Sequence, residues 1–225
     1  MSKSIKERFR AFLSRSSADR KARRKAIRTI GEAHGFVYFG AVDQHEDEHH
    51  VVRGFSASTS HEDDAYMVGA VDGIDVRIVD RSDMVELPGG VTESHQWLIV
   101  EATLPIEKDL PRFFLLPTHH ESTHYKQVFH GLRALEQIDM TNHSHELQSR
   151  YTVYAAPGDS TEIDELFPVE TTKVIAAHFW PFAIEIYENT VYLYSVETPL
   201  TKHDVLAGIK NSAWLAQTLE HRRDT

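Results

Sequence analysis

The chain has 225 residues, of which 41% are apolar and 26% are charged, as is typical of a globular domain. It contains no cysteine, which excludes disulfides, thiolate nucleophiles and thiolate metal sites, and which fits a reducing compartment. The sequence has neither a secretory h-region nor a run of about 18 apolar residues, so we expect a cytoplasmic protein without a membrane span.

The net charge of −10 conceals an uneven distribution. The first 30 residues contain eleven Lys and Arg against Glu7 and Asp19, a formal charge of +9, so the rest of the chain carries −19. A basic arm joined to an acidic body favours an anionic partner at one end of the molecule and repels it at the other.

The basic segment has a helical pattern. Its first apolar residues recur at the spacing of one helical face: Ile5, Phe9, Phe12 and Leu13. We expect Ser14–Ser17 to interrupt this helix, and a second helix to continue to about Ala33, where Gly35 can end it. The prediction is a basic amphipathic arm over residues 1–17 and a single α+β domain over residues 18–225.

The middle of the chain reads as antiparallel sheet. Two β-branched runs flank Asp72–Gly73, a pair that tolerates the positive φ angles of a type I′ turn. On the return strand Ile74, Val76 and Ile78 alternate with Asp75 and Arg77, so we expect one face of the strand to be buried and the other to be exposed to solvent. Further strands are expected at residues 36–39, 96–104, 112–116 and 149–156.

The second half adds helices. Asp159 and Glu162 resemble a capping box for a helix that Pro168 interrupts and restarts. A hairpin over residues 182–195 then precedes a final helix, which begins near Thr201 and Asp204. We therefore predict an α+β fold: an antiparallel sheet covered on one side, with helices at the N-terminus, in the second half and at the C-terminus.

On these motifs the chain resembles a widespread family of uncharacterised bacterial proteins, in which an Arg-rich helix precedes a strand of the type R-G-[WF]-x-[YF]. The stretches that carry the resemblance are Arg23–Arg28 with His34–Tyr38, Val68–Val79, Leu110–Pro117, Ser149–Tyr154 and Leu166–Pro168. The resemblance implies a central antiparallel sheet and a C-terminal hairpin followed by a helix, with no established activity. Many members of that family look membrane-anchored by hydrophobic N-terminal helices. Here a basic amphipathic segment takes that place, which favours peripheral contact.

The basic arm is the best candidate for a functional site. The residues expected to contact an anionic membrane surface or a protein partner are Lys3, Ile5, Lys6, Arg8, Phe9, Arg10, Phe12 and Leu13. Alternatively, the arm folds onto the acidic body of its own chain or onto a second copy in a homo-oligomer. We do not expect nucleic acid as the partner, because the acidic body opposes it and no recognised binding module is present.

Histidine is frequent, with 15 residues and three clusters, which raises the question of a metal site. The clusters are His45, His49 and His50; His119, His120 and His124; and His143 and His145. His120-Glu121-Ser-Thr-His124 matches H-E-x-x-H, so a metal-dependent hydrolase with His120 and His124 as ligands is the alternative function. The segment follows a Pro-terminated strand and lacks an apolar helical pattern, which favours solvated histidines.

Other motifs give no support for catalysis. The acid pairs Asp63–Asp64 and Asp164–Glu165 are expected on solvated faces, and Trp97, Trp180 and Trp214 in the core. Neither a Gly-x-Ser-x-Gly elbow nor a nucleotide-binding glycine loop occurs. The sequence therefore predicts a non-enzymatic binding or interaction module without a cofactor. It would lie in the cytoplasm, at the inner face of the membrane if its partner is a lipid surface.

Overall fold

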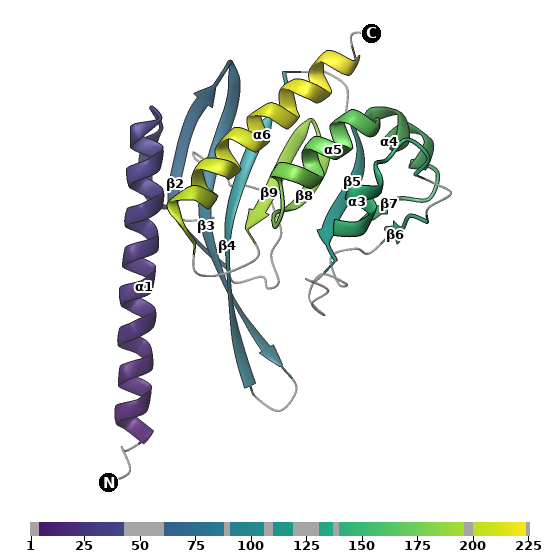
Figure 1. Ribbon diagram of the computed structural model, residues 1–225. Coiled ribbons are helices and arrows are strands. Elements are labelled where there is room, and N and C mark those ends of the chain that lie inside the picture. The colour runs from purple at the N-terminus through teal and green to yellow at the C-terminus, as the bar shows by residue number, and fades with distance from the viewer. Residues whose placement is uncertain are drawn as a thin grey trace.

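The structure is a computed structural model that describes residues 5–42, 61–87, 91–105, 110–118, 131–136, 140–195 and 200–223. For residues 5–18, 83–87, 91–95 and 222–223 it describes the backbone alone. Within these ranges the chain forms five helices and one nine-stranded antiparallel sheet (Figure 1). This confirms the predicted α+β class, with helices at the N-terminus, in the second half and at the C-terminus.

Most of the predicted elements are present, with bounds that differ by up to five residues. A helix over residues 145–150 was not predicted, and it includes Ser149 and Arg150, which we expected in a strand. The helices are α1 (Ile5–Ala33), α3 (His145–Arg150), α4 (Ser160–Leu166), α5 (Val169–His178) and α6 (Lys202–Arg223). The strands are β1 (Val37–Val42), β2 (Glu62–Val71), β3 (Ile74–Leu87), β4 (Val91–Thr103), β5 (Leu110–Pro117), β6 (Arg133–Ala134), β7 (Tyr151–Ala155), β8 (Ala183–Glu188) and β9 (Thr190–Ser195). Their order in the sheet is β1-β2-β3-β4-β9-β8-β5-β7-β6.

The predicted central hairpin is formed by β2 and β3. Val71 pairs with Ile74, and the intervening Asp72 and Gly73 have φ angles of 51° and 88°, as a type I′ turn requires. The side chains of Ile74, Val76 and Ile78 are buried, whereas Asp75 is exposed. The alternation therefore assigns the faces of this strand correctly.

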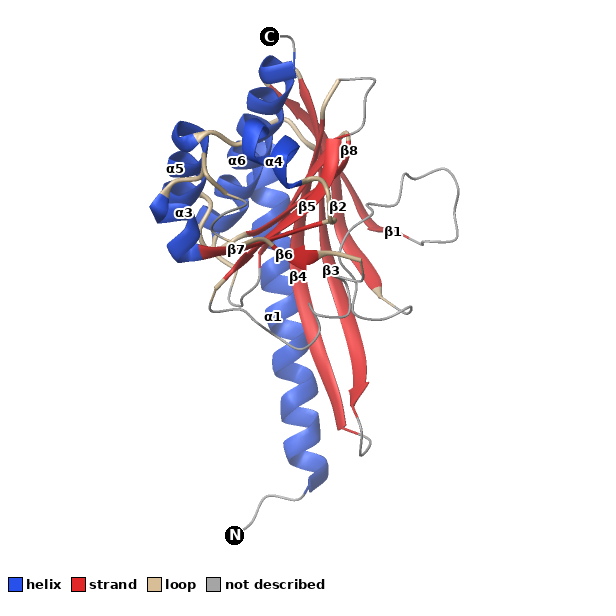
Figure 2. Ribbon diagram, turned by 90° about the vertical axis from the view of Figure 1, so that its right-hand side faces the viewer, coloured by secondary structure: helices blue, strands red, loops and turns tan. Residues whose placement is uncertain are grey.

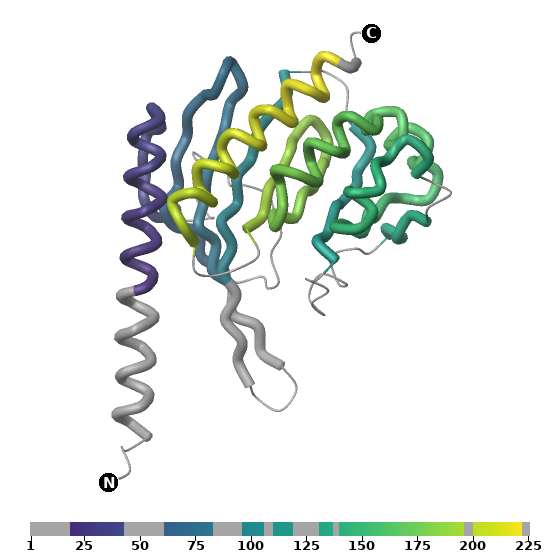
Figure 3. The backbone as a smooth tube through the Cα atoms, viewed as in Figure 1, coloured from purple at the N-terminus to yellow at the C-terminus, as the bar shows by residue number. Residues whose placement is uncertain are grey.

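A late hairpin joins the two halves of the sheet. Strands β4 and β5 are consecutive in the chain but are not neighbours, because β9 pairs with β4 and β8 pairs with β5. The β8–β9 hairpin thus lies between them, and the described strands form one continuous sheet (Figure 3).

The described helices lie on one face of the sheet, as Figure 2 shows. Helix α6 crosses β3, β4 and β9, and it comes so close to β4 that a Cβ on Gly208 would lie 3.0 Å from Val100. At its N-terminus the Asp204 amide donates to Thr201 Oγ1 at 3.2 Å, and the Thr201 amide donates to Asp204 Oδ2 at 2.7 Å. This reciprocal cap fixes the start of the helix where the sequence placed it.

Side chains are also buried on the sheet face opposite the helices. They form a second, largely aromatic cluster of Val42, Tyr66, Val79, Trp97, Ile99, Phe114, Leu116, Ala183, Tyr192 and Tyr194. The helices cover one side of the sheet as predicted, and the burial of side chains on the opposite face is an additional feature that we did not predict from the sequence. The three tryptophans lie in or against the core as predicted, Trp97 in this cluster and Trp180 and Trp214 against the helical side.

Two further local predictions are wrong. Helix α1 runs without a break through Ser14–Ser17, because serine costs only about 0.5 kcal/mol relative to alanine and its neighbours here are good helix formers. Asp159 precedes α4 but makes no capping hydrogen bond, since its backbone is itself in the helical region, at φ −89° and ψ −5°. None of the described helices is both long enough and apolar enough to cross a membrane.

Candidate functional site: an anchored basic helix

One side of α1 is fixed to the sheet by a buried ion pair. Arg23 Nε donates to Asp80 Oδ1 at 2.7 Å, and Gln96 Nε2 donates to Asp80 Oδ2 at 3.0 Å. Arg23 and Asp80 are only 8% and 5% exposed, so both charges have lost most of their water. The two terminal nitrogens of the Arg23 guanidinium are buried and have no hydrogen-bond partner in the part of the chain that the structure describes.

Burial is the largest influence on the pKa of Asp80. It raises the pKa of Asp80 from 3.8 to about 6, although the charge of Arg23 and its hydrogen bond act in the opposite direction. The cost of removing Arg23 and Asp80 from water is therefore only partly offset by the attraction between their charges.

Few apolar side chains of α1 are buried against the sheet. Ile27 is the fully buried large apolar side chain among residues 19–33, and Ile30 is half-buried against the same core. Gly31 leaves no room for a Cβ against Met67, which lets the helix approach β2 closely. The ion pair between Arg23 and Asp80 is therefore one of the main contacts that position α1 on the sheet.

A basic flank of α1 lies beside the first two strands. Arg24 forms an ion pair with Asp64 of β2. Arg28 donates to Glu32 Oε1 at 2.7 Å, and its guanidinium lies 4.8 Å from the centre of the Tyr38 ring on β1. These contacts fix the rotation of the helix about its axis, with this flank turned toward the edge of the sheet.

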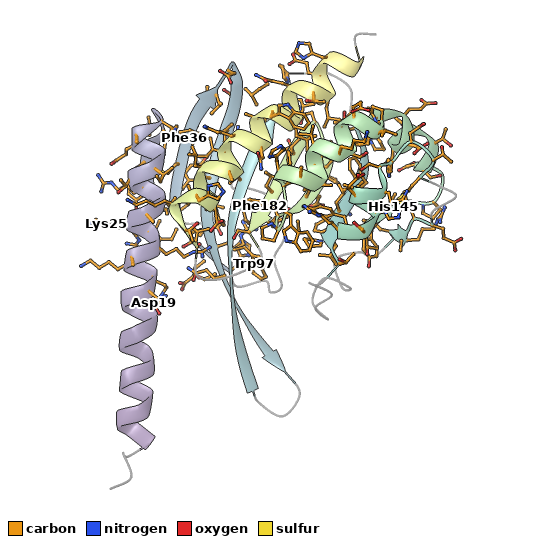
Figure 4. The ribbon with its side chains drawn as sticks, viewed as in Figure 1. Asp19, Lys25, Phe36, Trp97, His145 and Phe182 are labelled. Carbon is orange, nitrogen blue, oxygen red and sulfur yellow. The ribbon has the colours of Figure 1, made fainter. Side chains whose placement is uncertain are left out.

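Three cations of α1 project into solvent. Arg20, Lys21 and Lys25 are exposed, and none of them forms an ion pair with another described residue. Figure 4 shows Lys25 on the side of α1 that faces away from the sheet. The helix thus combines an anchored side with a cationic side that is open to an anionic partner.

The predicted contact residues lie outside the described side chains. The backbone of Ile5, Lys6, Arg8, Phe9, Arg10, Phe12 and Leu13 belongs to α1, and Lys3 precedes the described chain. Their role stays a prediction. His120 and His124 also lie outside the described ranges, and among the residues that are described no three His, Asp or Glu side chains converge as metal ligands.

One member of each acid pair is buried, contrary to the prediction, whereas Asp64 is partly exposed and Glu165 is exposed as expected. Asp63 is buried and accepts two hydrogen bonds of 2.7 Å from Arg81, one to each carboxylate oxygen. Asp164 is buried as well and accepts from the Thr141 hydroxyl at 2.7 Å and the Asn142 amide at 2.8 Å. Both carboxylates are structural, because the fold supplies the donors that water would otherwise provide.

One of the predicted solvated histidines is also buried. His143 lies 3.8 Å from Asp164, measured from Nε2 to Oδ1, and neither ring nitrogen has a hydrogen-bond partner among the described residues. Burial lowers the pKa of His143, with the nearby Asp164 charge acting in the opposite direction. This histidine is therefore neutral at pH 7, whereas His145 is exposed as expected.

A polar network crosses the sheet face opposite the helices. Arg77 of β3 pairs with Glu101 of β4. Across β5, β8 and β9, Arg112 donates to Glu185 Oε1 at 3.1 Å, and the Tyr194 hydroxyl donates to Glu185 Oε2 at 2.7 Å. Each of these carboxylates has a cationic partner, which offsets the cost of burying it on this face.

Comparison with known proteins adds a fold relationship. No family model matches the chain, and no curated protein matches it. Among solved structures, the chain is similar to the crystal structure of the mycobacterial trehalose monomycolate transport factor A, TtfA, with a TM-score of 0.58 and 10% sequence identity. The match covers 88% of this chain and 93% of that one. At this identity the likeness shows a shared fold alone.

Proposed function

We propose that this chain is a non-enzymatic interaction module that engages an anionic surface, of a membrane or of a protein partner, through α1. The observation that carries the proposal is the division of the helix into two sides. Arg23 and Ile27 hold one side against the sheet, while Arg20, Lys21 and Lys25 project outward without an ion-pair partner among the described residues.

The charge distribution supports this assignment. The first 30 residues carry +9, and the rest of the chain carries −19, so an anionic surface is attracted to the helix and repelled elsewhere. In its membrane form, the module would act as a peripheral protein at the inner face of the cytoplasmic membrane. TtfA, which shares the fold, is named as a transport factor, and that name is compatible with a module that binds and does not catalyse.

The strength of the contact can be bounded. Each cation near an anionic bilayer contributes about 1 kcal/mol, so Arg20, Lys21 and Lys25 together contribute about 3 kcal/mol, or about a hundredfold in partitioning. Binding should weaken as salt screens these charges.

The test is co-sedimentation of the full chain with vesicles of phosphatidylcholine alone or mixed with phosphatidylglycerol, at low and high salt. The variant Arg20→Glu/Lys21→Glu/Lys25→Glu should lose binding to the anionic vesicles. A matched control reverses three exposed lysines on α5 and α6, Lys173, Lys202 and Lys210, and should retain more binding despite the same change in net charge.

The protein-partner form makes a parallel prediction. A partner that co-purifies with the wild-type chain and with the control variant should be lost with the α1 variant. Equal behaviour of the α1 and control variants in both assays would show that α1 is not the contact.

A further inference from the structure

The edge strand β1 exposes an unusual amount of apolar surface. Val37 and Phe39 are 58% and 52% exposed, which makes them the most exposed large hydrophobic residues of the described chain. The next is Val169 on α5, at 37%. Two such residues on one six-residue strand form an apolar patch at the border of the sheet.

The patch and the basic flank of α1 lie on either side of the same strand. The Tyr38 ring contacts Arg28, so Tyr38 points toward α1. Val37 and Phe39 alternate with Tyr38 and therefore point to the other face, where the Phe39 ring lies 5.7 Å from that of Tyr66. The edge thus presents apolar side chains on one face and the cationic helix on the other.

Two further cations of α1 lie in line with Arg28. Lys21, Lys25 and Arg28 follow one another at helical spacings of four and three residues, which places them on one stripe. Arg28 shares its charge with Glu32, whereas Lys21 and Lys25 have no such partner in the described structure.

We propose that this edge is a membrane-docking surface for an anionic phospholipid bilayer. Val37 and Phe39 enter the boundary between headgroups and acyl chains, and Arg20, Lys21 and Lys25 contact lipid phosphates. The inference rests on the proposed function in its membrane form and adds the orientation of the module. Apolar insertion and charge attraction reinforce each other in such interfacial binding.

The same features argue against a second copy of the chain as the occupant. The pairing of β1 with β2 shifts register on both sides of Gly40, so β1 is an irregular template for an added strand. A twofold contact at this edge would also bring two cationic helices toward each other, which like charges oppose.

The first test compares two substitutions of the same kind at exposed valines. Val37→Ser, alone and together with Phe39→Ser, should lower partitioning of the full chain onto phosphatidylglycerol-containing vesicles, by about tenfold for the pair. Val169→Ser on α5 should leave partitioning within about twofold, because it lies outside the docking edge. All of these side chains are exposed, so the variants should fold.

The second test uses the absence of cysteine from the chain. A single Phe39→Cys variant carrying an environment-sensitive fluorophore should show a blue shift with anionic vesicles. The same fluorophore on Val169→Cys should not respond.

The outcomes separate this inference from the proposed function. If charge reversal on α1 abolishes vesicle binding while Val37→Ser/Phe39→Ser does not change it, the docking edge is wrong and the role of α1 stands. If the label at position 39 responds to protein concentration without lipid, the patch is a contact between copies and the inference is overturned. If the wild-type chain does not bind anionic vesicles, both the inference and the membrane form of the proposed function are wrong.

Discussion

The ion pair under α1 allows a quantitative prediction about how the helix is held. Arg23→Met removes the counter-charge of a buried carboxylate, and Asp80→Leu leaves a buried guanidinium unpaired. Each single variant should lower the free energy of unfolding by about 3–5 kcal/mol. The double variant should lie close to the wild type, because removing both charges also removes the desolvation of each.

The assay is urea unfolding of the four proteins at pH 7, combined as a double-mutant cycle. Lys173→Met supplies a control, since its partner Glu170 is solvent-exposed and the loss of such a pair should change stability by less than about 1 kcal/mol. Single variants that each cost less than about 1 kcal/mol would refute the reasoning, as would a double variant as unstable as the two single changes combined.

The pH dependence gives an independent check with a defined sign. The pKa of Asp80 in the folded chain, about 6, is higher than the ordinary 3.8, so the folded state binds this proton more tightly than the unfolded chain. The contribution of Asp80 to stability therefore rises as pH falls from about 6 to about 4, by about 3 kcal/mol in total. The difference in unfolding free energy between the wild type and the Arg23→Met/Asp80→Leu variant should show this rise. A flat or falling difference on acidification would contradict it.

Three further predictions concern other parts of the chain. Gly69→Ala should destabilise the fold by about 1–3 kcal/mol in thermal or urea unfolding, because the added Cβ would lie 2.7 Å from the buried Phe36 ring. Tyr194→Phe should cost about 1.5–3 kcal/mol, because it removes a hydrogen bond to the charged Glu185. Metal analysis of protein purified without an affinity tag should find no stoichiometric zinc; one zinc per chain, lost on substitution of His120 and His124, would favour the hydrolase alternative.

Each of these has a matched control. Ala70→Ser changes an exposed neighbour of Gly69 and should stay within about 0.5 kcal/mol of the wild type. Tyr38→Phe removes a hydroxyl from a half-buried ring and should be nearly neutral. Replacing the exposed His178 and His203 should not alter metal content.

Part of the candidate site could be read from local patterns. The cationic character of α1 follows from composition. Continuing the alternation of β3 as far as Asp80 would place it on the same face as Ile78, a signal for a buried partner that our predictions did not use. The sequence could not name Arg23 as that partner, because the two residues are 57 positions apart and meet only when α1 docks on the sheet.

The pairing of Asp63 illustrates the same limit within a hairpin. Counting outward from the Asp72–Gly73 turn places Asp64 opposite Arg81. A register shift near Ala65, which has a φ of 54°, moves the pairing by one residue, so that Asp63 meets Arg81. An irregularity of this kind depends on packing and leaves no clear trace in the alternation.

The sequence by itself determined most of the strands and the main helices, because hydrophobic period and turn residues are encoded within a few residues of each other. It also determined that positive charge precedes a negative body. Only the tertiary structure decided that β8 and β9 lie between β4 and β5, which arginines are neutralised, and that Val37 and Phe39 share an edge with the basic helix. Those outcomes depend on contacts between segments far apart in the chain, and such contacts are selected by the packing of the whole molecule.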